Sequence, residues 1–260
     1  MNETAIAWTD LTWNPASGCA KISLGCKHCY AESLAEQKRG TRAFPNGFDL
    51  TVRRHKLDEV RRVKRPSLIF VNSMSDLFWD RFPADLRDEA FDVMEAHPQH
   101  VFQLLTKRPA AMAAYSQTRP FARHIWAGAT VEHGDTMGRL AQLRSVRAET
   151  RFISAEPMLG PLPGLDLAGI SWVIVGGESG SHLSDPAIMS ARGMVERVNG
   201  RWAPRPDRAQ WVRDVRDACY EHGSAFFFKQ WGGPTPKSGG DLLDGDRYNE
   251  FPWLPEGRIQ

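Results

Sequence analysis

The sequence predicts an α/β fold, namely a partial or open barrel of six or seven parallel β/α units. From residue 66 onward, short apolar runs alternate with polar residues and amphipathic helical patterns, as is typical of parallel β/α units. Most of the runs are rich in Val, Ile or aromatic residues, which suits strands buried on both faces. A chain of 260 residues fits one such barrel with elaborations.

Six apolar runs are expected to be strands. They are Ser67–Ser73, Val101–Thr106, Ile125–Val131, Arg151–Ala155, Ile170–Gly176 and Ala225–Lys229. A shorter run, Leu11–Asn14, is a candidate first strand. The total of six or seven falls short of a closed eight-stranded barrel.

Three segments have helical patterns. We expect helices at Ala31–Lys38, at Pro83–Ala96 and at Asp207–Glu221, the last with Asp207 as its N-cap. In the third helix Cys219 falls on the apolar face. We therefore expect Cys219 to pack in the core as a small hydrophobic residue.

The domain prediction is a single barrel over residues 1–232. It carries an insertion at about 40–66 and a loop at about 179–206 that contains Gly, Ser, Arg and Pro. Residues 233–260 are rich in Gly, Pro and Asp and predict a mostly irregular C-terminal tail.

Composition excludes several classes of protein. Hydrophobic residues make up 42% of the chain and charged residues 25%, which excludes a wholly disordered, collagen-like or coiled-coil chain. The absence of a long apolar run and of a secretory leader pattern predicts a cytoplasmic protein without a membrane partner. With a net charge of +2, a nucleic-acid surface has to be a local patch.

Polar residues follow the predicted strands, and right-handed crossovers bring the carboxyl ends of parallel strands to one rim. These residues are Ser75 and Asp76, Lys107, Glu132, Glu156, Glu178, and Lys229 with Trp231. They are the expected lining of a site at the rim. The alternative is the ordinary polarity of loops.

A cysteine motif, Gly18-Cys19-(six residues)-Cys26-Lys27-His28-Cys29-Tyr30, follows the first candidate strand. A structural zinc site needs four protein ligands, and the chain has no second Cys-x-x-Cys pair. Three thiolates therefore favour a [4Fe–4S] cluster held by Cys19, Cys26 and Cys29. A zinc site and three unligated thiols remain alternatives.

The opening TWNPASGCAKISLGCKHCYAE resembles the phage-associated three-Cys-motif proteins of the radical S-adenosylmethionine superfamily. Further similarity lies in SMSDLFWD, LLTKRP, AEPMLGP, VIVGGESG and FFFKQWGG. The resemblance implies a radical-SAM-type barrel with an elaborated C-terminal segment, and a [4Fe–4S] cluster and S-adenosylmethionine as cofactors. The spacing of six residues before Cys26 departs from the three that are usual in the superfamily.

The chain is also similar to the spore photoproduct lyase branch at Cys29-Tyr30, Ser75-Asp76 and Thr106-Lys107. The similarity implies that Asp76 meets the cofactor's amino group and Lys107 its carboxylate. Alternatively, either residue belongs to a surface ion pair. The full set of implied cofactor-binding residues is His28, Tyr30, Ser75, Asp76, Lys107, Glu156 and Glu178. Residues 73–75 lack the branch's hydrogen-donating cysteine, so we do not expect the same repair chemistry.

The function implied by the resemblance is reductive cleavage of S-adenosylmethionine to a 5′-deoxyadenosyl radical that abstracts hydrogen from a substrate. A flavodoxin or ferredoxin would donate the electron, and no catalytic residue is assigned. Two alternatives are a non-catalytic iron–sulfur or zinc protein that binds nucleic acid or a partner protein, and a hydrolase that uses Glu156 and Glu178.

A basic segment suggests nucleic acid or a nucleotide as substrate. Its cations are Arg53, Arg54, Lys56, Arg61, Arg62, Lys64 and Arg65, against the acids Asp58 and Glu59. A solvated basic helix is the alternative interpretation.

Overall fold

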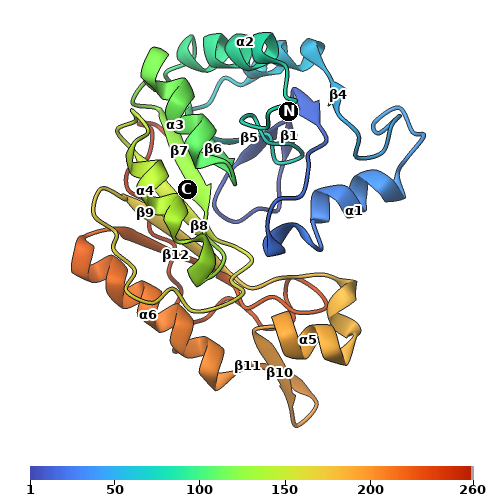
Figure 1. Cartoon of the computed structure of the whole chain (residues 1–260), viewed down its shortest axis with the longest axis vertical. Coiled ribbons are helices and arrows are strands. Elements are labelled where there is room, and N and C mark those ends of the chain that lie inside the picture. The colour runs from blue at the N-terminus through green and yellow to red at the C-terminus, as the bar shows by residue number, and fades with distance from the viewer. Residues whose placement is uncertain (259–260) are drawn as a thin grey trace. The chain divides into compact units, whose positions relative to one another are not determined.

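The computed structural model describes residues 1–258, which form two compact units (Figure 1). The first unit contains Met1–Ala129, Gln142–Thr150 and the residues from Trp253 onward. The second contains Thr130–Ala141 and Arg151–Pro252.

The strands of the first unit lie in the order β1-β2-β5-β6-β7. Their bounds are Asn2–Glu3 for β1, Leu11–Trp13 for β2, Leu68–Val71 for β5, Val101–Thr106 for β6 and Ile125–Thr130 for β7, of which only Thr130 falls in the second unit. The pairs from β2 to β7 are parallel, and β1 is antiparallel to β2. Strands β3 (Ala16–Ser17) and β4 (Thr51–Val52) form a small separate sheet.

The helices of the first unit are α1 (Tyr30–Gln37), α2 (Ala84–Glu95) and α3 (Pro109–Thr118), with 3-10 turns η1 (Leu24–Cys26) and η2 (Arg54–Arg62). Figure 1 shows α2 and α3 beside the strands of this unit. Helix α2 buries Leu86, Ala90 and Met94, spaced by four residues, so one face of the helix joins the core. Helix α4 (Gly138–Arg144) contains residues of both units, and η3 (Gly134–Thr136) precedes it.

The second unit contains the parallel strands β8 (Arg151–Ala155), β9 (Trp172–Gly176) and β12 (Ala225–Gln230) in the order β8-β9-β12. All five residues of β9 are buried. Helix α6 (Pro206–His222) contacts β9 and β12. Between β9 and α6 lie η4 (Ser181–Ser184), α5 (Pro186–Arg192) and an antiparallel hairpin of β10 (Val195–Val198) and β11 (Arg201–Pro204).

The predicted strands are present, and the bounds of β6 and β8 are those that were expected. The three predicted helices are also present as α1, α2 and α6. Cys219 is fully buried on α6, which confirms its packing role. The predicted N-cap Asp207 is wrong: Arg205 occupies that position and Pro206 begins the helix, because the fixed φ of proline suits the first helical residue. The segment 179–206 holds a helix and a hairpin, so it differs from the predicted loop.

The result is a mixed α/β fold with four parallel strands in the first unit and three in the second, compatible with an open barrel. In the predicted tail, Phe227 bridges Asn249 and Leu243 bridges Asp246. Residues 259 and 260 lie outside the described part of the chain, and the single-domain boundary at 232 stays a prediction. Within residues 1–258, no helix combines the length and apolar character needed to cross a membrane.

Candidate functional site

Asp76 organises the carboxyl ends of β5 and β6 in the first unit. Its carboxylate is 6% exposed and accepts hydrogen bonds from the Thr106 hydroxyl at 2.7 and 2.9 Å. It also accepts from Arg108 Nη1 at 2.9 Å and from the backbone amides of Phe78 and Lys107 at 2.9 and 3.3 Å. Asp76 thus joins the turn after β5 to the end of β6.

Arg108 extends this network to the cysteine segment. Its Nη2 donates to the carbonyl of Ala20 at 3.0 Å, and its Nη1 donates to Cys19 Sγ at 3.7 Å. Burial raises the pKa of the Cys19 thiol, and the nearby charge of Asp76 adds to this, while Arg108 acts in the opposite direction. The net shift favours the neutral thiol.

The other two cysteines of the motif have different surroundings. Cys26 Sγ lies 3.7 Å from the Ser23 hydroxyl. Burial alone would raise the pKa of Cys26, but hydrogen bonds with the backbone of Ile22 and the charge of Lys107 lower it. Cys29 is the N-cap residue of α1 and packs against an apolar cluster that includes Ala31 and Met74.

The three thiols therefore do not gather around one point. Within residues 1–258, no group of three or more His, Cys, Asp or Glu side chains is placed to hold a metal ion. The predicted pair of cofactors, a [4Fe–4S] cluster held by Cys19, Cys26 and Cys29 together with S-adenosylmethionine, is wrong on this finding. The local reason is that η1 and the start of α1 direct Cys26 and Cys29 into separate environments.

The remaining residues predicted for this end of the first unit make mostly internal contacts. The Tyr30 hydroxyl donates to the carbonyl of Ser73 at 2.7 Å, although the residue is 55% exposed. Ser75 pairs with Gly18 in an isolated bridge. Lys107 and His28 are half-buried.

Three acids of the second unit that follow strands are paired with cations. Glu178 is 6% exposed and holds Arg192 in a two-pronged contact, with Oε2 to Nε at 2.6 Å and Oε1 to Nη2 at 2.7 Å. Glu132 accepts from Arg139 at 2.7 Å. Glu156 accepts from Lys229. Trp231, also predicted for the rim, is buried, and its indole N–H donates to Leu242.

The predicted binding roles of Glu156 and Glu178 stay a prediction, and the structure shows that each carboxylate is ion-paired. Both oxygens of Glu178 are engaged by one guanidinium group, so the carboxylate ties α5 to the end of β9. Such contacts are typical of structural ion pairs. They lend no support to the alternative of a hydrolytic acid pair.

Asn72, which directly follows β5, was not among the predicted site residues. Asn72 is 3% exposed and has a φ of 59°. Its backbone is bonded, because its N–H donates to Trp13 at 2.8 Å and its carbonyl accepts from Ser75 at 3.2 Å. Within residues 1–258, however, neither Oδ1 nor Nδ2 of its side chain has a hydrogen-bond partner.

This arrangement is unfavourable in the protein alone. A buried polar group without a partner costs about 1–3 kcal/mol, and left-handed backbone is uncommon even for asparagine. The register places Val71 beside Leu104, so Asn72 lies level with Leu105. Leu105 is the one half-buried residue of β6, which indicates that the sheet is accessible at this level.

Two cations follow β6, the strand beside Asn72, and one of them, Arg108, is paired with Asp76. Lys107 lies close enough to Cys26 to affect its pKa, and Arg108 follows on the same segment. We call Asn72, Asp76, Lys107 and Arg108 the strand-end site. A sequence signal for Asn72 was present, since asparagine tolerates left-handed backbone better than most residues. The apolar run Ser67–Ser73 concealed it by suggesting a longer strand.

The basic segment lies elsewhere in the first unit, mostly before β5. Arg53 donates to the Ser17 hydroxyl at 2.7 Å, and Arg54 forms ion pairs with Asp85 and Glu89 of α2. These two cations are structural. The exposed cations that remain are Arg61, Arg62, Lys64 and Arg65, at the opposite end of β5 from the strand-end site.

Comparison with known proteins gives no match among curated proteins and none among solved structures. A family model matches residues 3–192 and 199–252. It is not a radical S-adenosylmethionine or three-Cys-motif family, so the predicted recognition, including the similarity to the spore photoproduct lyase branch, is wrong. Short motifs, around the cysteines and after the predicted strands, carried that resemblance, and such motifs recur in unrelated families. The chain belongs to the family described as "Protein of unknown function (DUF5131)".

Proposed function

We propose that the protein is an enzyme that binds a nucleotide, free or within a nucleic acid, at the strand-end site of its first unit. The observation that carries the proposal is the buried, unpartnered side chain of Asn72. Its position supports the proposal further, because ligands of parallel α/β sheets bind at the carboxyl ends of the strands.

The chemistry of the Asn72 amide and of its neighbours indicates the class of ligand. A carboxamide presents an acceptor and a donor side by side, which complements a ligand edge that also has one of each, such as the edge of a nucleobase. Lys107 and Arg108 follow β6, and since Asp76 neutralises Arg108, Lys107 is the proposed contact for a phosphate. A nucleotide combines both features in one molecule.

The proposal does not use the predicted radical reaction, which depended on the corrected cofactors. The class of reaction stays open. Phosphate contacts by Arg61, Arg62, Lys64 and Arg65 stay a separate prediction for longer nucleic acids, since these residues lie at the other end of β5.

The direct test is binding of the four nucleoside 5′-monophosphates and of a short single-stranded oligonucleotide, measured by calorimetry. We expect Asn72→Gly to weaken binding about tenfold, the size of one lost pair of hydrogen bonds to a base. Glycine also accepts the left-handed backbone, so the variant is expected to fold. Asn199→Gly is the matched control, because Asn199 has a φ of 50° in an exposed turn.

Equal affinity of the Asn72→Gly variant and the unaltered protein would contradict the proposal. Mass spectrometry of the bound nucleotide after incubation tests the enzymatic part. A change of mass that is lost in Asn72→Gly supports catalysis. Tight binding without any change of mass favours the non-catalytic alternative.

A further inference from the structure

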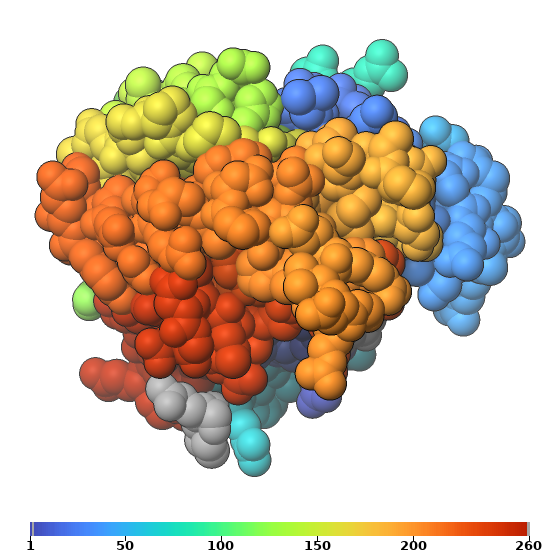
Figure 2. Space-filling view, turned by 90° about the horizontal axis from the view of Figure 1, so that it is seen from below, coloured from blue at the N-terminus to red at the C-terminus, as the bar shows by residue number. Residues whose placement is uncertain are grey.

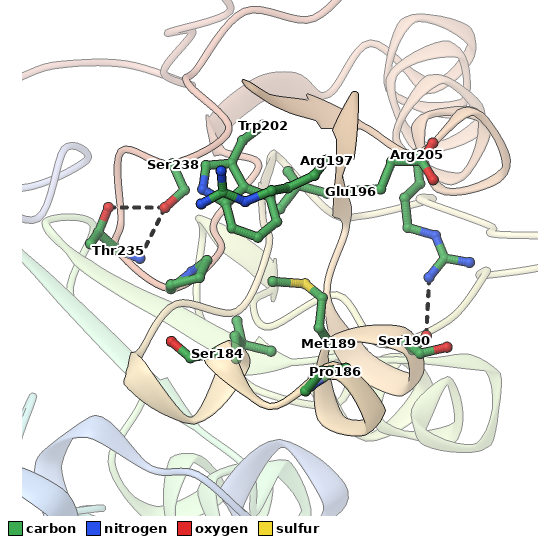
Figure 3. Close-up of a pocket in the computed structure, with 13 residues that line it drawn as sticks. Ser184, Pro186, Met189, Ser190, Glu196, Arg197, Trp202, Arg205, Thr235 and Ser238 are labelled. Atoms are coloured by element: carbon green, nitrogen blue, oxygen red, sulfur yellow. Dashed lines mark hydrogen bonds between the residues drawn. The ribbon is translucent and has the colours of Figure 1, made fainter. Parts of the chain in front are cut away.

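An open cavity of about 780 Å³ lies in the second unit, remote in sequence from the strand-end site (Figure 3). Its walls come from α5, from the β10–β11 hairpin and from the segment after β12. We call it the hairpin pocket. Its central residues are Met189, Val195, Arg197, Trp202, Thr235 and Ser238. The volume is within the range of small-molecule sites.

The hairpin places an aromatic ring and a cation together at the pocket. Arg197 and Trp202 are directly opposite in the β10–β11 register, and the guanidinium carbon lies 4.7 Å from the centroid of the ring. Figure 3 shows the two side chains side by side over the pocket. The next pair, Val198 and Arg201, projects to the other face of the hairpin because strand residues alternate.

Of the two arginines at the pocket, Arg205 is paired with Asp207, whereas Arg197 has no carboxylate partner among residues 1–258. Arg197 donates to the carbonyl of Gly200 at 3.0 Å, and within residues 1–258 no carboxylate forms a salt bridge with it. Arg205 Nη1 donates to the carbonyl of Ser190 at 3.1 Å, and its Nε lies 3.5 Å from the exposed Asp207. One carboxylate, Glu196, also lines the pocket. The pocket therefore favours an anion.

Hydroxyl and apolar groups complete the lining. Ser238 Oγ lies 3.0 Å from both the backbone nitrogen and the hydroxyl of Thr235. Met189 reaches into the pocket from α5 (Figure 3). The wall behind it is closely packed, since a Cβ on Gly193 would lie 2.1 Å from the Met189 sulfur.

Buried ion-pair and hydrogen-bond contacts hold the walls of the pocket. Arg192, at the end of α5, is held by Glu178, and the buried Arg208 of α6 donates to the carbonyls of Gly193 and Ser190. In Figure 2 the orange segment that contains the β10–β11 hairpin projects beyond the surface around it. The pocket thus combines a firmly held floor with an accessible aromatic and cationic edge.

We propose that the hairpin pocket binds a nucleotide unit, with the base stacked at Trp202 and the phosphate at Arg197 and Arg205. An aromatic ring offers its face to every base, and arginine is the preferred partner of phosphate. The inference does not rest on the proposed function, because all of these residues lie in the second unit. The bound nucleotide is either a free nucleotide or one residue of a single-stranded nucleic acid.

The test measures fluorescence anisotropy of a labelled oligothymidylate of eight nucleotides, with thymidine 5′-monophosphate as competitor. We expect Trp202→Leu and Arg197→Gln each to weaken binding about tenfold, as the loss of a base stack or a phosphate contact does. Arg201→Gln is the matched control, since it removes the same charge from the other face of the hairpin. We expect less than about a twofold effect from it.

The two sources of the nucleotide give different results. Equal affinity for the monophosphate and the oligonucleotide indicates a free nucleotide, whereas tighter, salt-dependent binding of the oligonucleotide indicates nucleic acid. Absence of binding by both probes, or an equal loss in Arg197→Gln and Arg201→Gln, would overturn the proposal. Asn72→Gly separates the two sites, because it should leave binding at the hairpin pocket unchanged. Trp202→Phe should restore most of the binding lost in Trp202→Leu if stacking is the cause.

Discussion

The strand ends of the two units show opposite ways of treating buried polar groups. In the second unit the acids after β8 and β9 are matched by cations, Glu156 by Lys229 and Glu178 by Arg192. In the first unit Asp76 is fully bonded, but four residues earlier the amide of Asn72 has no partner among the described residues. The comparison teaches that burial and polarity alone do not identify a ligand site. Unused hydrogen-bonding capacity is the better indicator.

The largest expected effect concerns the buried ion pair of Glu178 and Arg192 in the second unit. Arg192→Met leaves the Glu178 carboxylate buried without its cation, so we expect the free energy of unfolding to fall by about 3–5 kcal/mol. Urea denaturation, monitored by circular dichroism, measures this free energy. A double variant, Arg192→Met with Glu178→Leu, should recover much of the loss. If the single variant loses less than about 1 kcal/mol, the pair is not structural.

A smaller loss is expected from the bonded carboxylate of the first unit. Asp76→Asn keeps the shape but removes the charge that faces Arg108, which is 2.9 Å away. We expect a loss of about 2–3 kcal/mol, typical of a hydrogen bond to a charged group. Arg108→Met in the same background should then add little, as a double-mutant cycle would reveal. Additive losses would contradict a direct interaction.

The Asn72→Gly variant is expected to change stability in the opposite direction. Removing the unpartnered amide and relaxing the backbone at a φ of 59° should raise the free energy of unfolding by about 1–2 kcal/mol. Asn199→Gly reports the backbone contribution alone, because Asn199 is exposed. A gain no greater than that of the control would show that the amide of Asn72 carries no cost. Denaturation of both variants in parallel gives the answer.

The smallest expected effect is on the pH dependence of the first unit. His100 is fully buried, and burial together with the nearby His97 lowers its pKa. The neutral ring is therefore the form that stabilises the fold, and stability declines as the pH falls below the unfolded value of about 6.5. We expect the midpoint of urea denaturation to drop between neutral pH and pH 5. In His100→Gln the midpoint should depend less steeply on pH. The same pH dependence of the midpoint in His100→Gln and in the unaltered protein would show that other groups cause the loss of stability in acid.

The alternation of apolar runs and helical patterns was sufficient to predict most of the fold. Burial of β6 and β8 on both faces leaves a clear signal in Val101–Thr106 and Arg151–Ala155. The hairpin of β10 and β11 escaped prediction because its exposed residues lack a two-residue alternation of apolar side chains. Its Asn199-Gly200 turn was the available signal.

The candidate site was predicted only in part. The backbone amide of Lys107 donates to Asp76 at the end of β6, so the two residues lie at neighbouring strand ends, as their places in the sequence suggested. The side chain that pairs with Asp76 is that of Arg108, a residue that the prediction did not include. The cysteine motif misled the prediction, because spacing in a sequence does not fix the direction of each thiol.

By itself, the sequence determined the parallel strands, three of the helices and the polar residues at the strand ends, since these follow from local patterns of burial. Only the tertiary structure decided which of those polar groups neutralise one another and which remain unsatisfied. The reason is that a hydrogen bond depends on distance and direction between residues far apart in the chain, as between Glu178 and Arg192 or Asp76 and Thr106.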